Sequence, residues 1–145
     1  MGLPGAGKTT LARALARRLS NTHTVEWLNA DVVRGQSEDW DFSHDGRLRQ
    51  SSRMAELADR STAEFVVADF VAPLPEMRNI FRADVVVWVD TIQESRFPET
   101  DRVFVPPENP DFRLGERDAE SWAARIAEAV RLKLRVGLPP KSGGL

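Results

Sequence analysis

Apolar and polar residues alternate along the chain in blocks that predict helices separated by short buried strands. Leu11, Leu15 and Leu19 recur at helical spacing and predict a helix over residues 10–19. Three apolar runs predict strands, at 24–29, 63–71 and 84–90. The last two are short and end near an aspartate, which is typical of buried parallel strands. The pattern therefore predicts an α/β fold with a mainly parallel sheet.

Three further helices are expected. Ser43 is the predicted N-cap of a long helix that runs to about Arg60 and has only a weak apolar face. One side of it carries Arg47, Gln50 and Arg53, a grouping that a solvated face explains equally well. Prolines open a short helix over 73–81. Asp118 caps an amphipathic helix whose predicted buried stripe consists of Trp122, Ile126, Ala129 with Val130, and Leu134.

The segment between 91 and 117 has a weaker pattern. Residues 92–97 suggest a helical turn, 98–101 a loop and 102–105 a short strand. The proline-rich connection 106–111 is either a lid over a nearby site or a plain linker.

A glycine-rich stretch at the start of the chain fits G-x-x-x-x-G-K-[ST], the phosphate-binding loop of nucleotide-binding proteins. Its glycines allow successive N–H groups to surround an anion, and the helix behind it directs a positive dipole end at the same place. Lys8 supplies a charge near the β and γ phosphates, and the Thr9 hydroxyl can bind Mg²⁺. The expected ATP-binding residues are Gly2, Leu3, Pro4, Gly5, Ala6, Gly7, Lys8, Thr9 and Thr10.

Such a loop normally follows a buried strand, but only Met1 precedes Gly2. A misassigned start that truncates the first strand explains this pattern. The alternative is a version of the fold that lacks a strand usually central to its sheet.

Length and composition set the remaining limits. The 145 residues predict one kinase domain, 1–136, and a flexible tail, 137–145. A net charge of −2 gives no general reason to bind nucleic acid or anionic membranes. The chain contains no cysteine, which suits the cytoplasm, and no apolar run reaches the ~18 residues of a membrane span.

Two aspartates stand where parallel sheets build their sites, just after predicted strands. Asp31 is either a helix N-cap or a general base and Mg²⁺ partner. Asp69 is either a Mg²⁺-supporting carboxylate or ordinary turn chemistry.

The order of these motifs resembles the adenylylsulfate (APS) kinase family of P-loop kinases. Its L-D-G-D-N-V-R segment is similar to residues 28–34, and its G-F-S-x-x-D-R-x-E-N-I-R-R segment to residues 41–53. Its F-I-S-P segment is similar to residues 70–73. The departures are Asn29 for the first Asp, Gly46 for the Asp before Arg, and Gln50 for Asn. The lysine-rich lid has no counterpart, and only Phe104 offers a match to the following F-T-G-I-D.

This resemblance implies a three-layer P-loop fold and a kinase that uses ATP and Mg²⁺ to phosphorylate the 3′-hydroxyl of adenosine 5′-phosphosulfate. Asp31 would be the catalytic base beside Lys8, and Mg²⁺ would be held by Thr9, Asp31 and Asp69. The substrate-binding residues would be Arg34, Phe42, Arg47, Gln50, Val71, Ala72 and Phe104. Phe42 would stack on the acceptor's adenine, while Arg34 and Arg47 would hold its phosphosulfate.

Two other functions remain open. The short lid favours a P-loop kinase of another hydroxyl acceptor, such as a nucleoside, a modified nucleotide or a nucleic-acid end. The missing strand and Asn29 favour a nucleotide-binding protein without activity. The expected partners are small-molecule substrates, and a homodimer remains open.

Overall fold

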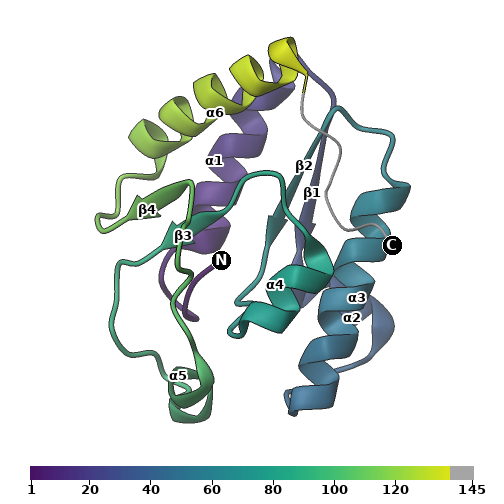
Figure 1. Ribbon diagram of the computed structural model, residues 1–145, viewed down its shortest axis with the longest axis vertical. Helices are drawn as coiled ribbons and strands as arrows, with labels where there is room; N and C mark the ends of the chain where they lie inside the picture. The colour runs from purple at the N-terminus through teal and green to yellow at the C-terminus, as the bar shows by residue number, and fades with distance from the viewer. Residues whose placement is uncertain (138–145) are drawn as a thin grey trace.

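The computed structural model describes residues 1–137 and has helices on both sides of parallel strands (Figure 1). Its strands are β1 (Val25–Asn29), β2 (Phe65–Asp69), β3 (Val87–Val89) and β4 (Phe112–Leu114). Its helices are α1 (Lys8–Ser20), α2 (Ala30–Ser37), α3 (His44–Arg60), α4 (Pro75–Phe81), α5 (Pro98–Val103) and α6 (Ala119–Val136). The predicted tail lies, apart from Gly137, outside the described residues. No helix in residues 1–137 is both long and apolar enough to cross a membrane.

Most of the expected elements are confirmed. The leucines of α1 are buried against β3, β4 and α6, as their spacing predicts. Ser43 caps α3 by accepting from the Gly46 N–H at 3.2 Å, and Asp118 caps α6 by accepting from Ser121 at 3.2 Å. The buried stripe of α6 is centred on Ala123, Ile126 and Ala127 and has Trp122 and Val130 at its edges.

Three local predictions are wrong. The loop predicted at 98–101 and the strand predicted at 102–105 are both wrong, because Pro98 starts helix α5, which ends at Val103. Proline fills an N-terminal position of a helix that needs no N–H. No helix forms over 92–97. Residues 30–37 form helix α2. Its N-cap is Asn29, since the Asn29 side chain accepts from Val32 N–H at 3.1 Å, and this excludes the N-cap alternative for Asp31. Strand β4 had no clear sequence signal.

The four strands form two separate parallel pairs, β1 with β2 and β3 with β4. Helix α1 contacts β1, β2 and α6, while α3 packs against β1, β2 and α4 on the other side. Figure 1 shows both strand pairs with a space between β2 and β3. One apolar core joins α1 and α6 to β3 and β4, and a second core around Leu28, Val33 and Met54 lies under α3.

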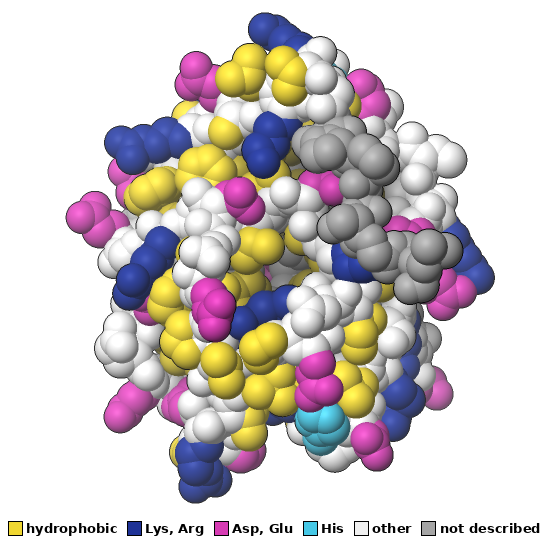
Figure 2. Space-filling view, in the orientation of Figure 1, with side chains coloured by type: hydrophobic (Ala, Val, Ile, Leu, Met, Phe, Trp, Pro, Cys, Tyr) yellow, Lys and Arg dark blue, Asp and Glu magenta, His cyan; other side chains and the backbone are white. Residues whose placement is uncertain are grey.

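An apolar cavity of about 180 Å³ lies in the space between the two strand pairs. Its walls include the whole of β2 on one side and residues Val85–Val87 on the other, with Leu15 and Ile126 behind. Figure 2 shows hydrophobic side chains around a hollow in this face of the molecule.

Met1 lines this cavity and is hydrogen-bonded to β3. Its amine donates to the Val87 carbonyl at 2.8 Å, and its carbonyl accepts from Val89 N–H at 2.9 Å. These two bonds follow the pattern of a parallel ladder. Burial, together with the nearby charges of Lys8 and Arg78 and against that of Asp69, lowers the pKa of the Met1 amine to about 5.

A free Met1 amine therefore makes stability depend on pH. An unfolded amine with a pKa near 8.0 binds a proton between pH 5 and pH 8 that the folded amine does not bind. The unfolding free energy of the unblocked chain should thus rise across that interval. Denaturant unfolding of the unblocked and N-acetylated chains at pH 5, 6.5 and 8 measures it. The acetylated chain also carries both histidines, so an equal slope in both chains would contradict the buried amine.

Candidate nucleotide and acceptor site

The phosphate loop, residues 2–7, connects Met1, which is hydrogen-bonded to β3, to the start of α1. A Cβ at Gly2 would lie 2.4 Å from the Val89 carbonyl oxygen, so only glycine allows the loop to leave the strand this closely. The far end is held by Thr91, whose hydroxyl donates to the Ala6 carbonyl at 2.6 Å. Leu3 and Ala6 are buried beneath the loop. Both ends of the loop are thus attached to the half of the molecule that contains β3, β4 and α6, here called the β3 half.

Lys8 lies across the loop and donates from Nζ to the Leu3 carbonyl at 2.9 Å. Burial lowers the pKa of its ammonium, and the carboxylates of Asp69 and Asp31 oppose that shift. A buried ammonium with a single carbonyl partner has N–H capacity left for an anion. The phosphates of a nucleotide are such an anion, and their negative charge would stabilise the buried ammonium of Lys8.

A buried carboxylate joins this loop to the other half of the molecule. Asp69, at the end of β2, is only 5% exposed, and its Oδ2 accepts from three donors. These are Asn29 Nδ2 at 2.8 Å, Thr9 Oγ1 at 3.2 Å and Trp27 Nε1 at 3.3 Å. The parallel register of β1 and β2 places Asn29 beside Asp69. Thr9 and Asp69, two of the side chains expected at Mg²⁺, therefore lie within hydrogen-bonding distance of each other.

These residues fit a magnesium ion that is shared with a nucleotide. Within residues 1–137, no group of three or more His, Cys, Asp or Glu side chains forms a metal site. Mg²⁺ commonly keeps one or two protein oxygens and takes the rest from phosphates and water. The Thr9 hydroxyl and the adjacent Asp69 carboxylate offer such oxygens, and Asp31 lines the same cavity.

The loop opens onto a cavity of about 690 Å³. One wall contains the loop and the start of α1, including Lys8, Thr9 and Thr10. Part of the remaining wall comes from segments that follow β1 and β2, and part from the region around α5. Its lining residues there include Asn29, Asp31, Phe42, Arg47, Val71, Arg96, Phe97, Glu99 and Thr100.

Two exposed aromatic rings line this cavity. Phe42 is 52% exposed and Phe97 is 44% exposed, so both rings are accessible to a ligand in the cavity. Arg47 connects their two segments, since it donates to the Phe42 carbonyl at 2.9 Å and to Thr100 Oγ1 at 2.8 Å. Burial lowers the pKa of the Arg47 guanidinium.

Sequence reasoning overlooked Phe97 and selected Phe104 instead. Phe104 does not line the cavity and packs under Arg78, whose guanidinium carbon lies 5.6 Å from the ring centroid. The signal for Phe97 was its place directly before Pro98, at the start of α5. The turn, loop and strand predicted for residues 92–105 conceal that signal.

Arg34 and Gln50 are buried behind the main cavity rather than facing it. Arg34 donates from one nitrogen to the carbonyls of Asp39 and Asp41, at 3.0 and 3.1 Å. Its guanidinium lies 4.3 Å from the centroid of the Phe42 ring. Gln50 donates to the Ala30 carbonyl at 3.0 Å. Both residues line a smaller cavity of about 60 Å³, together with Val71 and Ala72.

Gly46 allows the loop that carries Phe42 to approach α3. A Cβ at this position would lie 2.2 Å from the Asp41 carbonyl oxygen. The loop is also held by Arg49, which pairs with Asp39 at 3.2 Å and Asp41 at 2.8 Å. These hydrogen bonds lower the pKa of both carboxyl groups, that of Asp41 to about 2.

Comparison with known proteins agrees with this geometry. A sequence model described as adenylylsulphate kinase matches residues 1–94, which is more than half of the chain. The chain belongs to the adenylylsulphate kinase family. A probable adenylyl-sulfate kinase of Aeropyrum pernix is 39% identical over 85 residues, which cover 56% of this chain and 46% of that protein. The chain thus spans about half the length of this relative.

Two further relatives extend the likeness to nearly the whole chain. The adenylyl-sulfate kinase of Halothermothrix orenii is 26% identical over 168 aligned positions, covering 95% of this chain and 90% of the relative. The structure of the Mycobacterium tuberculosis APS kinase in complex with AMPPNP and APS superposes with a TM-score of 0.75. That alignment is 22% identical and covers 90% of this chain and 94% of the other. The predicted P-loop kinase fold is therefore confirmed.

The structure makes a prediction about Asn29, which replaces the first Asp of the family's L-D-G-D segment. Asn29→Asp would keep an N-cap oxygen for α2 but would place a second carboxylate beside Asp69 and remove the 2.8 Å hydrogen bond. We expect a loss of about 1–3 kcal/mol in the absence of Mg²⁺, and a larger stabilisation by Mg²⁺ with an ATP analogue than in the unchanged chain.

Thermal unfolding with and without Mg²⁺ and the ATP analogue measures both effects. Asn29→Ser is the control, because it keeps an N-cap oxygen for α2 and removes the amide hydrogen bond to Asp69 without adding charge. If Asn29→Asp were as stable as the unchanged chain without Mg²⁺, the side chains of Asn29 and Asp69 would not be adjacent.

Proposed function

We propose that this chain is an ATP-dependent kinase that transfers the γ-phosphate of ATP to the 3′-hydroxyl of adenosine 5′-phosphosulfate. The observation that carries the proposal is the composition of one cavity. A phosphate loop lies on one side of it, and two exposed aromatic rings with the half-buried Arg47 lie on another. A site with these features suits a nucleotide donor and an aromatic, anionic acceptor.

The donor side supplies position and charge. Phosphoryl transfer needs alignment and charge neutralisation more than covalent chemistry by the protein. The N–H groups of the loop and the N-terminus of α1 surround the β and γ phosphates, and Lys8 follows the transferring group. Thr9 and Asp69 would hold Mg²⁺, which would supply further neutralisation of the phosphate charge.

The acceptor side fits an adenine nucleotide. Phe42 and Phe97 offer apolar faces for the purine, and Arg47 offers a guanidinium for the anionic end. Asp31 lines the same cavity in the first turn of α2, and its carboxylate is exposed. Asp31 takes the proton from the attacking hydroxyl. Arg34 acts indirectly, since it holds the loop that carries Phe42.

A kinase of another hydroxyl acceptor is the second candidate. The segment between β3 and β4 contains no lysine, whereas APS kinases have a lysine-rich lid there by the sequence resemblance. Incubation with γ-labelled ATP and a panel of acceptors separates the candidates. The panel contains APS, adenosine, AMP and an oligonucleotide with a free 5′-hydroxyl. Label transfer to APS above all others supports the proposal, and preferential transfer to another acceptor would replace it.

Lys8→Ala should lower turnover by roughly 10²–10³-fold, because it removes the charge that accompanies the phosphoryl group. Its side chain has one hydrogen bond to the protein, so the fold should be retained. Steady-state kinetics and a thermal melt of the same preparation measure both. A folded variant with unchanged turnover would show that this loop does not bind the reacting phosphates.

Phe42→Ala and Phe97→Ala should each raise the KM for the acceptor and leave the KM for ATP unchanged. Loss of one stacking face, at ~1–3 kcal/mol, corresponds to a KM increase of roughly 5- to 150-fold. Phe104→Ala is the matched control, since it removes the same side chain outside the cavity. An unchanged acceptor KM in both cavity variants, or an increase only in the control, would contradict this assignment of the acceptor wall.

A further inference from the structure

Arg117 lies against the phosphate loop although it is distant in sequence. It follows β4, and one of its terminal nitrogens donates to the Gly5 carbonyl at 2.9 Å. Its other terminal nitrogen is 3.5 Å from the position that a Cβ on Gly7 would occupy. Arg117 also lines the large cavity. It lies outside residues 1–94, so the match to the family assigns it no role.

The charge of Arg117 is not neutralised by a carboxylate. Other arginines in this half of the molecule have such partners, for example Arg113 with Asp90 at 2.8 Å and Arg18 with Glu120 at 3.7 Å. Within residues 1–137, Arg117 makes no ion pair, and its one side-chain hydrogen bond is to the loop. A guanidinium has five N–H donors and two flat faces, so most of its binding capacity is free.

The position of Arg117 separates it from the proposed acceptor. Asp31 and Phe42 follow β1, on one side of the cavity, whereas Arg117 follows β4 in the other strand pair. The γ-phosphate must face the acceptor hydroxyl for transfer. The nucleoside of ATP must then leave the loop away from Asp31, which brings it toward the side where Arg117 lies.

We propose that Arg117 recognises the nucleoside end of the donor by stacking its guanidinium on the purine ring. The hydrogen bond to Gly5 orients the guanidinium plane, so that the loop and the base-binding face form one rigid surface. Planar guanidinium groups stack on aromatic rings, and an ammonium group does so less well. This inference rests on the proposed function, because it requires ATP at the phosphate loop.

Two ligands distinguish base recognition from simple charge attraction. ATP analogues carry a base and a triphosphate, whereas inorganic tripolyphosphate carries only the phosphates. Arg117→Ala should weaken binding of a non-hydrolysable ATP analogue by roughly 5- to 30-fold and leave tripolyphosphate binding unchanged. In turnover, its KM for ATP should rise by the same factor, with kcat and the KM for the acceptor unchanged. Arg117→Lys should behave like Arg117→Ala, because lysine keeps the positive charge but lacks the planar group that stacks on the purine.

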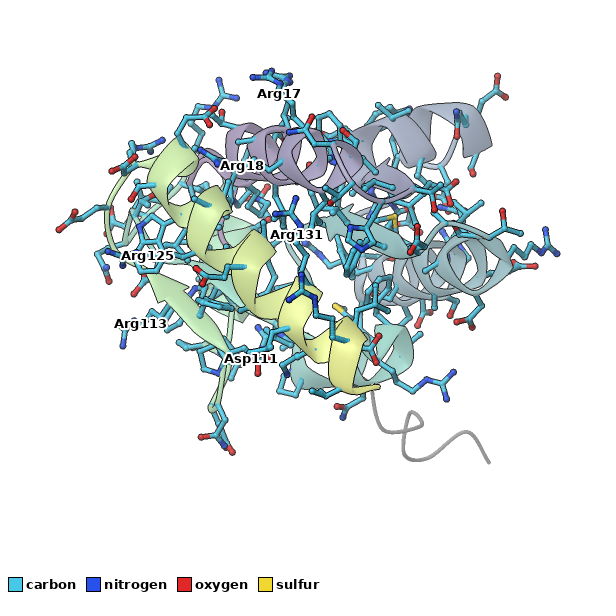
Figure 3. The ribbon with its side chains drawn as sticks, turned by 90° about the horizontal axis from the view of Figure 1, so that it is seen from above. Arg17, Arg18, Asp111, Arg113, Arg125 and Arg131 are labelled. Atoms are coloured by element: carbon cyan, nitrogen blue, oxygen red, sulfur yellow. The ribbon has the colours of Figure 1, made fainter. Side chains whose placement is uncertain are left out.

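Arg17→Ala is the matched control. Arg17 is exposed on α1, and Figure 3 shows its side chain pointing away from the body of the molecule. Isothermal titration of both ligands against all four proteins, in the presence of Mg²⁺, gives the result. Equal weakening of both ligands, full rescue by lysine, or no effect of Arg117→Ala would overturn the inference. Failure of the unchanged chain to bind the ATP analogue would overturn the proposed function itself.

Discussion

The site depends on helix α1, which connects two strand pairs that share no ladder with each other. Its side chains pack against β1 and β2 and against α6, and its first residues continue the phosphate loop. Thr9 bonds to Asp69 at the end of β2, while the loop in front of it is attached through Met1 to β3. The way the two strand pairs pack around α1 therefore determines the geometry of the phosphate site.

The junction explains why a few polar contacts matter so much. Between β2 and β3 there is an apolar cavity instead of a ladder, so the relative position of the two halves relies on helix packing and on the bonds of Asp69. The carboxylate is buried with three donors, an arrangement that favours a fixed position. The donor wall belongs mainly to the β3 half and much of the acceptor wall to the β1 half. Alignment of the donor's γ-phosphate with the acceptor's hydroxyl thus requires that the two halves of the molecule hold a fixed relative position.

Departures from the family pattern are accommodated locally. Asn29 stands beside Asp69 and donates to it, whereas an aspartate would repel it. Gly46 is required by the close approach of the Asp41 backbone, which places Phe42 at the cavity. Neither change removes a side chain from the phosphate loop. Both are compatible with a working donor site and alter the environment of the metal and the acceptor.

Local chemistry made much of the site predictable from the sequence. The phosphate loop, the α1 leucines and the caps Ser43 and Asp118 depend on neighbouring residues, and the structure has them where the sequence places them. The region between β3 and β4 was interpreted poorly, because its residues take their structure from distant contacts. Phe97 lines the cavity because Arg47 bonds to Thr100, and Arg117 reaches the loop across more than a hundred residues. The periodic pattern of apolar residues along the sequence carries no information about contacts between such distant residues.

The central claim is that donor and acceptor occupy adjoining walls of one cavity. The most direct test is the affinity of a bisubstrate analogue in which the 3′-oxygen of APS is joined to the terminal phosphate of an ATP analogue. Joining the two ligands makes binding of the second half intramolecular. We therefore predict a dissociation constant at least ~10²-fold below that of either half alone. We also predict that Lys8→Ala and Phe42→Ala each weaken it. A bisubstrate analogue that binds no better than the ATP half and is insensitive to Phe42→Ala would contradict the account.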